Sequence, residues 1–357
     1  MIPYFLIGAF VLQASFFDLT NLKNSRVIQF VLFVVLLLFI GTRDNIGTDW
    51  WIYEGFFDRE DEGWLLEPGY NLMQVIVRFF SGSYYQMVFL TAFVSLVVKF
   101  WAFNKISPLV FTSLLFYVAY YYIPQDANQV RQGLAAGILL FSIPHLANGN
   151  LKKFLLVVAI SSLFHISSLS FVILIPLARF RKWDTSLFLW IVGFSFLFLF
   201  INLNSFFVFL ISEVILRILP IDFASAKLEA YLFNKYSVGQ GFYLGSLFLL
   251  YFVGVFSIYR KMIDSEIFQV GFLVFVLGVV LNFFFSSFAV LGRLTFHFIL
   301  VGAILYGFIV FKENKLWVKA YHIMVLGVIL FLKVHNFITN DLMIDDYIPY
   351  KSILVLW

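Results

Sequence analysis

Long apolar runs separated by short polar connections make up almost the whole chain. With tilt and interfacial flanks allowed, each run can cross a hydrocarbon core about 30 Å thick as a helix. No fixed-period repeat relates the two halves of the chain, and no polar stretch is long enough to bury a core of its own. The pattern predicts an all-α, polytopic integral membrane protein with about 10–12 transmembrane helices in one domain, 1–357. We expect helices near 2–17, 27–41, 84–104, 108–124, 129–147, 153–178, 186–216, 241–259, 267–289, 293–311 and 316–334.

The longest polar interruption of this pattern is the stretch 41–69, which holds eight acidic residues against two basic ones. Five large aromatic residues lie within it between Trp50 and Phe57. Acidic loops are tolerated on the outer side of a bacterial membrane, and aromatic side chains favour its interface. We therefore expect 41–69 to form an extracytoplasmic loop on the membrane surface. A surface helix over 70–80, an outer loop over 218–240 and an amphipathic tail over 335–357 are expected on the same side.

Composition narrows the class further. At 62% hydrophobic and 12% charged residues, with 49 Phe among 357 residues, no water-soluble globule could hide the apolar surface. The first segment, 2–17, lacks a basic region and a small-residue cleavage site, so we expect a retained helix rather than a signal peptide. The absence of Cys excludes disulfides and thiolate chemistry, and no nucleic-acid-binding pattern is present.

Short connections rich in Lys and Arg indicate the cytoplasmic side by the positive-inside rule. This assignment leaves the N-terminus, the stretch 41–69, the turn 123–129, the turn around Gly292 and the C-terminal tail outside. The basic connections contain Lys23 and Arg26, Lys99 and Lys105, Lys152 and Lys153, Arg179, Arg181 and Lys182, Arg260 and Lys261, and Lys312, Lys315 and Lys319.

The stretch 153–178 conflicts with this topology, because basic residues flank it at both ends. One continuous helix would break the positive-inside rule once. A re-entrant hairpin that turns near His165 would keep the rule, but broken backbone at membrane depth is allowed only where it faces protein or a wet cavity. Since the serines of this stretch are all tolerated in continuous membrane helices, the sequence favours a single helix, with the hairpin as the alternative.

Three arginines lie at expected helix ends on the outer side. Arg43 ends the second helix, Arg131 begins the helix after the turn IPQDANQ, and Arg293 begins the helix after SSFAVLG. An arginine at a helix end can simply reach the lipid headgroups. Three of them on the side that the positive-inside rule disfavours instead indicate a phosphate clamp, because the guanidinium fork binds phosphate oxygens in pairs and keeps its charge.

Two histidines are candidates for proton transfer or ligand contacts. His165 lies deep in an apolar run, and helical spacing would place Ser161 and Ser168 on its face. Its imidazole could act as a general base or bond a ligand hydroxyl. The alternative is a neutral core histidine satisfied by a serine. His297 follows Arg293 by four residues, so both side chains can face one cavity.

The acidic loop supplies candidate sugar ligands. Asp44 adjoins Arg43, Asp49 precedes the aromatic run WWIYEGF, and Glu67 precedes the turn-forming Pro-Gly pair. Rings that stack on a pyranose, beside carboxylates that accept its hydroxyl groups, are typical of sugar sites. Interface anchoring would require the same aromatics, and both interpretations stay open. The acidic run 58–61 is more simply a solvated charge run than a metal site, so no metal is predicted.

Five segments resemble the EpsG-like family of Wzy-type O-antigen, capsule and exopolysaccharide polymerases. They are GTRDNIGTDWWIYEGFF, EPGYNLM, QVRQGLAAGILLFSI, SSLFHISSLSFVILIPL and LGRLTFHF, and the resemblance covers about residues 25–350. The most specific parts are Arg-x-x-x-Gly-x-Asp-x-x-x-Tyr (Arg43, Gly47, Asp49 and Tyr53), the Arg-Gln-Gly helix start and the single His within an apolar run. Trp50 and Trp51 stand where a Tyr is common in the family, which bears on sugar preference rather than on class.

The resemblance implies an enzyme of the bacterial inner membrane that polymerises repeat units carried on undecaprenyl diphosphate. The growing chain would pass to the non-reducing-end hydroxyl of a new lipid-linked unit on the outer face, with inversion. Under this interpretation Arg131 and Arg293, supported by Arg43, stabilise the departing diphosphate without a metal or cofactor. Either His165 or Asp49 takes the hydroxyl proton. The expected substrate contacts are Asp44, Trp50, Trp51, Tyr53, Glu67, Tyr70, Gln132 and His297.

Other functions stay open on the sequence. An O-antigen ligase would use the same donor with a different acceptor. A flippase or transporter of lipid-linked oligosaccharides would show repeat symmetry and charge near mid-membrane, and an outer-face acyltransferase would not need three outward arginines. The expected partners are lipid-linked oligosaccharide repeat units, membrane lipids and a chain-length-regulating co-polymerase, with no nucleic acid.

Overall fold

The computed structural model describes residues 1–20, 22, 25–59, 66–197, 199, 240–285, 289–339 and 344–354, which are mostly helical. Shorter apolar helices cover 26–41, 185–197 and 244–260. The predicted all-α, multi-pass membrane class is confirmed. The predicted outer loop 218–240, except its last residue, and the part 200–216 of the predicted helix 186–216 lie outside the described residues. Six described helices are long and apolar enough to cross a membrane, namely Ile2–Leu19, Tyr84–Ile106, Val130–Ala147, Glu266–Phe284, Gly292–Lys312 and Leu316–Ile338.

Several predicted spans are divided into shorter helices with small changes of helical geometry between them. In chain order the described elements are α1 (Ile2–Ser15), η1 (Phe16–Leu19), α2 (Arg26–Gly41), α3 (Trp50–Asp58), α4 (Pro68–Phe79), α5 (Tyr84–Ile106), α6 (Val110–Tyr117), η3 (Val118–Asp126), α7 (Val130–Leu139), α8 (Ser142–Ala147), α9 (Leu151–Ser162), η4 (Ile166–Ile173), α10 (Leu174–Leu177), η5 (Ala178–Lys182), α11 (Thr185–Leu197), α14 (Gln240–Arg260), α15 (Glu266–Phe284), α16 (Ala289–Leu294), α17 (Phe296–Ile299), α18 (Gly302–Lys312), α19 (Leu316–Ile338) and α20 (Ile344–Tyr347).

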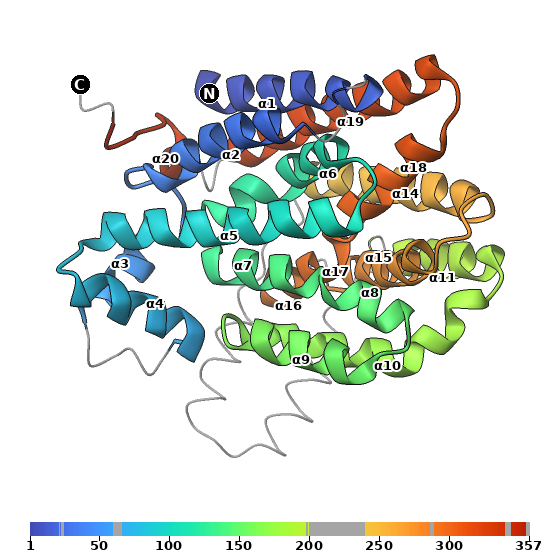
Figure 1. Ribbon diagram of the computed structural model, residues 1–357, viewed down its shortest axis with the longest axis horizontal. Coiled ribbons are helices and arrows are strands. Elements are labelled where there is room, and N and C mark those ends of the chain that lie inside the picture. The colour runs from blue at the N-terminus through green and yellow to red at the C-terminus, as the bar shows by residue number, and fades with distance from the viewer. Residues whose placement is uncertain are drawn as a thin grey trace.

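The long helices run roughly side by side along the long axis of the molecule (Figure 1). At the top of this view α1 lies along α19, so early and late parts of the chain are neighbours. α5 packs against α2 and α7, and α7 packs against α9. The short helices α3 and α4 lie beside the start of α5 (Figure 1). We call this end of the bundle, where the loop 42–49 also lies, the loop end.

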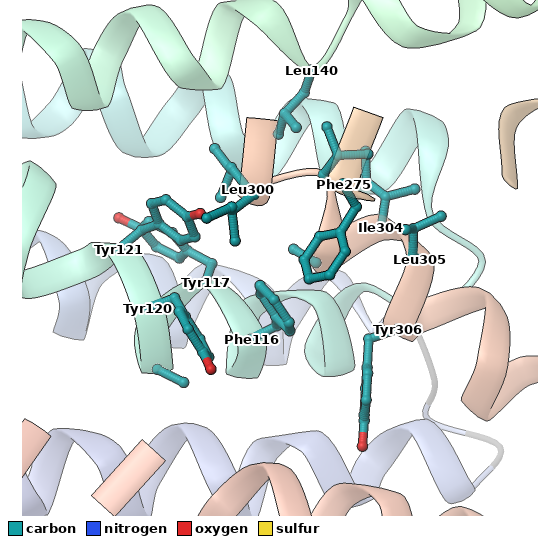
Figure 2. Packing of buried hydrophobic residues seen from close by; sticks show 14 of the residues in the cluster. Phe116, Tyr117, Tyr120, Tyr121, Leu140, Phe275, Leu300, Ile304, Leu305 and Tyr306 are labelled. Carbon is teal, nitrogen blue, oxygen red and sulfur yellow. The ribbon is translucent and has the colours of Figure 1, made fainter. Parts of the chain in front are cut away.

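A cluster of large aromatic residues fills the interior, as Figure 2 shows. The ring centroid of Phe116 lies 5.0 Å from that of Tyr120 and 5.0 Å from that of Phe252. Gly302 permits this packing, since a Cβ there would come within 2.6 Å of the Phe116 ring. In lipid, such close packing replaces the hydrophobic effect as the force that joins helices. The cluster therefore fixes η3, which leads into the loop end.

Lys99 corrects one part of the expected topology. The sequence placed it in a cytoplasmic connection, whereas it lies within α5 and is fully buried. Its ammonium lies 2.8 Å from a carboxylate oxygen of Asp126 and donates to the Ser95 hydroxyl. Tyr117 donates to the other oxygen of the same carboxylate. An ionised group inside a membrane protein is retained where a partner charge meets it, and Asp126 at the end of η3 is that partner.

The stretch 153–178 is a hairpin, so the favoured single helix was wrong. α9 ends at Ser162, His165 is extended with φ −157° and ψ 120°, and η4 packs back along α9. The serines that argued for a continuous helix instead join the two arms. Ser161 and Ser168 bond each other at 2.7 Å, and Ser161 also donates to the carbonyl of Ala135 at 2.8 Å. Both basic flanks thus lie on one side, as the positive-inside rule requires.

The tail over 344–354 folds back onto the loop end, and we call it the C-terminal strap. The Asp44 N–H donates to the carbonyl of Lys351 at 3.1 Å, and the Ile353 N–H donates to that of Thr42 at 2.9 Å. These bonds flank the isolated bridge between Arg43 and Ser352. The strap therefore closes the loop that precedes α3.

The predicted surface helix and amphipathic tail are each partly seen. The helix expected over 70–80 is α4, which buries Tyr70 and exposes Leu72 and Phe79. The beginning of the tail expected over 335–357 completes α19, and its last three residues lie outside the described part of the chain.

Candidate active site

The loop before α3 is held from two sides. Gly47 has φ +109°, a conformation that side chains disfavour, and its N–H donates to the carbonyl of Asp346 in the strap at 3.0 Å. On the other side, the Asn128 amide oxygen accepts from the Asp49 N–H and the Thr48 hydroxyl, both at 2.9 Å. These contacts set Asp49 against the turn that joins η3 to α7.

The same turn leads directly to Arg131 near the start of α7. The Arg131 guanidinium forms an ion pair with Glu67, donates to the Tyr53 hydroxyl at 3.3 Å and lies 5.4 Å from the centre of the Tyr53 ring. Glu67 also accepts from the Ile166 N–H in the hairpin at 3.2 Å. Glu67 thereby connects Arg131 to the hairpin tip.

Arg293 approaches from the other half of the chain. Its guanidinium lies 3.9 Å from the Asp49 carboxylate, and its carbonyl accepts a hydrogen bond from the Gln132 amide. The side chain of Arg293 is 43% exposed, which leaves several of its N–H donors for a ligand. Two arginines, each beside a carboxylate, therefore face one region at the loop end.

A serine joins the two histidines. The Ser167 hydroxyl lies 2.6 Å from Nδ1 of His165 and 2.6 Å from Nε2 of His297. His297 is fully buried, and its Nδ1 has no hydrogen-bond partner among the described residues. His165 is only partly buried at the hairpin tip. The arrangement connects an accessible imidazole to a buried one through a single hydroxyl.

Burial and nearby charges act on the pKa of His165. Burial lowers this pKa most; Glu67 raises it, and Arg131 and Arg293 lower it, with a net direction below the ordinary value. The sign follows from the cationic form, which burial and positive neighbours disfavour. His165 is therefore held neutral, the form in which an imidazole can accept a proton.

Arg43, an expected diphosphate ligand, lies buried against the backbone. It is 4% exposed, and its guanidinium donates to the carbonyls of Ile40 at 2.5 Å and Ile46 at 3.3 Å. It also lies 5.7 Å from the centre of the Trp50 ring. Because these contacts turn its donors toward backbone, the structure favours a structural clamp over the expected diphosphate ligand.

The aromatic candidates divide into buried and exposed groups. Trp50 is 3% exposed, with its ring centroid 5.0 Å from that of Tyr84, and Tyr70 is 2% exposed. These two rings belong to the core rather than to a sugar-stacking surface. Trp51 is 64% exposed and stays available for a ligand or the interface. The Asp44 carboxylate accepts from the Tyr85 hydroxyl at 2.8 Å.

Comparison with known proteins identifies the family of the chain. The EpsG family model matches residues 26–352, which include every candidate residue above. The chain belongs to the EpsG family. The amylovoran biosynthesis protein AmsC of Erwinia amylovora is 27% identical over 206 residues, which cover 51% of this chain and 54% of that relative. The chain thus aligns with about half the length of this relative, and no solved structure shows a significant match.

Sequence reasoning missed three residues of this candidate site. Ser167 was considered only as a serine tolerated in a membrane helix, and Asn128 and Asp126 only as parts of a turn. Their partners lie far away, since Ser167 meets His297 across 130 residues and Asn128 meets Asp49 across 79. Helical spacing cannot signal such contacts. Among the described residues, no group of three or more His, Asp or Glu is arranged to hold a metal ion.

Gly69, where α4 meets the hairpin tip, gives a first testable prediction. The Gly69 N–H donates to the carbonyl of Leu163 at 2.7 Å, and a Cβ at Gly69 would come within 2.8 Å of that oxygen. Gly69→Ala should therefore push α4 and the hairpin tip apart and lower catalytic turnover by roughly ten- to a hundred-fold, since a shift of about 1 Å can have that effect. Gly254→Ala is the control, because a Cβ there meets nothing within 4 Å. Equal turnover of the two purified variants would contradict the prediction.

Proposed function

We propose that this protein is a polysaccharide polymerase, a glycosyltransferase that joins lipid-linked repeat units. Membership of the EpsG family and similarity to AmsC, which its name links to amylovoran biosynthesis, support the proposal. The observation that supports it best is the meeting of Arg131, Arg293, Asp49 and His165 at the loop end from separate parts of the chain. Fixed positive charge, a carboxylate and a neutral imidazole are the groups that glycosyl transfer from a diphosphate needs.

The proposed donor is a growing glycan on undecaprenyl diphosphate, and the proposed acceptor is the non-reducing-end hydroxyl of a new lipid-linked unit. The hydroxyl oxygen attacks the anomeric carbon and forms the new C–O bond. At the same time the bond from that carbon to the diphosphate oxygen breaks, and the diphosphate leaves with the electron pair. The hydroxyl proton passes to a base. In-line attack opposite the leaving group inverts the anomeric centre.

Arg131 and Arg293 are the proposed ligands of the diphosphate. Charge develops on the leaving oxygen during the reaction, and preorganised cations there lower the barrier. In the structure Glu67 and Asp49 hold the two guanidiniums in place. The exposed N–H donors of Arg293 and the donors of Arg131 that do not face Glu67 or Tyr53 would meet the phosphate oxygens.

His165 is the preferred base of the two candidates. The Asp49 carboxylate already faces the Arg293 guanidinium at 3.9 Å, so it is engaged in holding that cation. His165 is neutral and partly accessible, and its Nδ1 lies 2.6 Å from the Ser167 hydroxyl. In the tautomer that carries its proton on Nδ1 and donates it to Ser167, Nε2 would accept the proton of the acceptor hydroxyl. The Ser167 bridge to His297 would fix the ring and its tautomer, as orienting groups do for other catalytic histidines.

The pH dependence of turnover tests this assignment. A base must be neutral, so turnover should fall as the pH drops through the pKa of His165. Because that pKa lies below the ordinary value of about 6.5, the acid limb of the profile should lie below pH 6.5. His165→Gln should lower turnover by about 10²- to 10⁴-fold and remove this limb. A limb that persists unchanged in His165→Gln would assign the proton transfer to another group, with Asp49→Asn as the next variant.

Sugar contacts are proposed for the remaining polar and exposed groups. Trp51 offers an exposed ring, and the carboxylates of Asp44 and Glu67 offer acceptors for hydroxyl groups. The other candidates would act indirectly, by holding the arginines and His165 in place. They are the buried rings of Trp50, Tyr53 and Tyr70, and the side chains of Gln132 and His297, which support Arg43, Arg131, Arg293 and His165.

The site is proposed to face outward from the bacterial inner membrane. This orientation follows from the positive-inside rule, since the basic flanks of the hairpin lie opposite its tip at the loop end. Membrane lipids would surround the exposed apolar helix faces, and a chain-length-regulating co-polymerase is a proposed partner.

Polymerisation by the purified full-length protein tests the function directly. The assay uses nanodiscs and undecaprenyl-diphosphate-linked repeat units from the host, with and without chelator. We expect a ladder of products that chelator leaves intact and His165→Gln removes. A single transfer to a different acceptor would favour a ligase, and movement of intact units across proteoliposomes without a ladder would favour a flippase.

A further inference from the structure

Lys333 is a basic residue on the side of α19 that faces the bundle, and the reaction proposed above does not use it. α19 runs from Leu316 to Ile338, so Lys333 lies little more than one turn from the loop end of this helix. Its ammonium lies 4.7 Å from the centre of the Tyr120 ring in η3. A Cβ on Gly245 of α14 would come within 3.4 Å of the same nitrogen. The side chain therefore points to the place where η3 and α14 meet α19, and not to lipid.

No carboxylate pairs with Lys333 among the residues that the structure describes. The contrast with Lys99 is clear, because Lys99 has Asp126 and Ser95 within hydrogen-bond distance. A cation within a membrane protein without a partner costs free energy and indicates a functional site. As a whole residue Lys333 is partly exposed, while its ammonium faces the Tyr120 ring.

Two neighbouring tyrosines of η3, one of which has its ring under the Lys333 ammonium, also have hydroxyl groups without partners within the described ranges. Tyr120 is 5% exposed and Tyr121 is 1% exposed, and neither hydroxyl has a hydrogen-bond partner there. In Figure 2 the Tyr120 ring lies beside that of Phe116, and the two centroids are 5.0 Å apart. Buried hydroxyls are normally satisfied. The ammonium over the Tyr120 ring and the unpaired hydroxyl of the same tyrosine are both groups that can donate to phosphate oxygens.

We propose that Lys333, with the Tyr120 hydroxyl, binds a lipid phosphate headgroup and that, given the proposed polymerase function, this is the diphosphate of the acceptor lipid. A polymerase holds two lipid diphosphates at once. The diphosphate of the donor departs at Arg131 and Arg293. The acceptor has its diphosphate at the opposite end of the repeat unit from the attacking hydroxyl, so a second, separate cation must hold it.

A row of aromatic rings lies between Lys333 and the histidines of the candidate active site. The ring centroid of Tyr120 lies 6.4 Å from that of Tyr121, which lies 5.7 Å from that of Phe296. Phe296 directly precedes His297, whose Nε2 contacts Ser167. A row of rings therefore separates Lys333 from the histidines, and an occupant at Lys333 would not displace the donor.

Binding of undecaprenyl diphosphate to the full-length protein tests the site. The measurement uses nanodiscs of phosphatidylcholine and a background that carries both Arg131→Ala and Arg293→Ala, which removes the two proposed diphosphate ligands of the donor site. We expect Lys333→Met to weaken binding by about ten-fold or more, whereas Lys333→Arg retains it. Lys315→Met is the matched control, because Lys315 lies 6.0 Å from the Trp317 ring centre at the other end of the same helix. In otherwise wild-type protein, Lys333→Met should raise the KM for the acceptor and leave the KM for the donor unchanged.

Thermal stability without ligand provides an independent measurement. Lys333→Met loses only the contact of the ammonium with the Tyr120 ring, so its Tm should fall far less than that of Asp126→Asn. A fall as large as that of Asp126→Asn would show that a charged group of the protein pairs with Lys333 and would overturn the proposal, as would unchanged binding. Tight binding of phosphatidylglycerol that undecaprenyl diphosphate cannot displace would assign the site to bulk lipid instead. Absence of polymerisation by the wild type would reject the polymerase function but not the binding result.

Discussion

Replacement of Arg131 by Ala should lower the turnover of polymerisation by about 10²- to 10³-fold, the effect expected when a donor to developing negative charge is removed. Arg131 begins α7 and is aimed by Glu67 and the Tyr53 ring, so its position needs no rearrangement during the reaction. Arg131→Lys should recover only part of the turnover, because an ammonium lacks the planar fork that meets two phosphate oxygens. The measurement is the rate of ladder formation by purified, folded variants.

Two further variants separate lost charge from lost structure. Arg26→Ala removes an exposed arginine at the start of α2 and should leave turnover unchanged. Arg131→Ala combined with Glu67→Gln avoids an unpaired carboxylate and should be as inactive as Arg131→Ala alone. Recovery of turnover in the double variant would mean that Arg131 acts only by neutralising Glu67, which would contradict its proposed contact with the diphosphate.

Replacement of Asp126 by Asn should lower the free energy of unfolding by about 3–5 kcal/mol, the range measured when one partner of a buried ion pair is removed. The side chains of Lys99 and Asp126 are each 1% exposed, so the orphaned ammonium would have no water to replace its partner. The turn after η3 depends on this pair, and with it the positions of Asn128 and Arg131. Thermal unfolding in one detergent, followed by circular dichroism, measures the loss.

Two controls test this prediction: the loss of one partner of a more exposed ion pair, and the removal of both charges of the buried pair. Glu266→Gln breaks an ion pair with Arg181 that is partly exposed on both sides and should change stability by less than about 1 kcal/mol. Lys99→Met combined with Asp126→Leu removes both charges and should recover much of the stability, because apolar replacement of a buried pair is often neutral. If Asp126→Asn were no worse than Glu266→Gln, the pair would not stabilise the turn.

The class of the fold could be predicted from sequence, but several of its interior details could not. Hydrophobic length alone dictates helices in a membrane, which is why the all-α, multi-pass class followed from the apolar runs, although the run 153–178 was wrongly interpreted as one helix. The hairpin at His165 depends on the hydrogen-bond partners of its serines. Ser161 bonds Ser168 and Ala135 only because α7 lies beside both arms of the hairpin. Lys99 looked like a loop residue since its partner Asp126 is 27 residues away.

In the candidate site, the sequence likewise indicated which residues matter but not which of them are in contact. Arg131, Arg293, His165 and Asp49 could be named because each is an unusual polar residue next to an apolar run. Their grouping by Glu67 and Ser167 is tertiary, across 64 and 130 residues, and one sequence has no periodic signal for it. Arg43 shows a further limit, since an arginine at a helix end gives the same sequence signal whether it binds a phosphate or backbone carbonyls.

The C-terminal strap implies an order of events during biosynthesis. Residues 344–354 leave the ribosome after all the described helices from α1 to α19, yet they bond to residues 42–47, which leave it early. The bond from Gly47 to Asp346 therefore cannot form until the helices between them have been inserted. A chain that is still being translated lacks this support for Asp49. The candidate site is therefore complete only after α19 and the strap have been made, so a partly inserted chain lacks it.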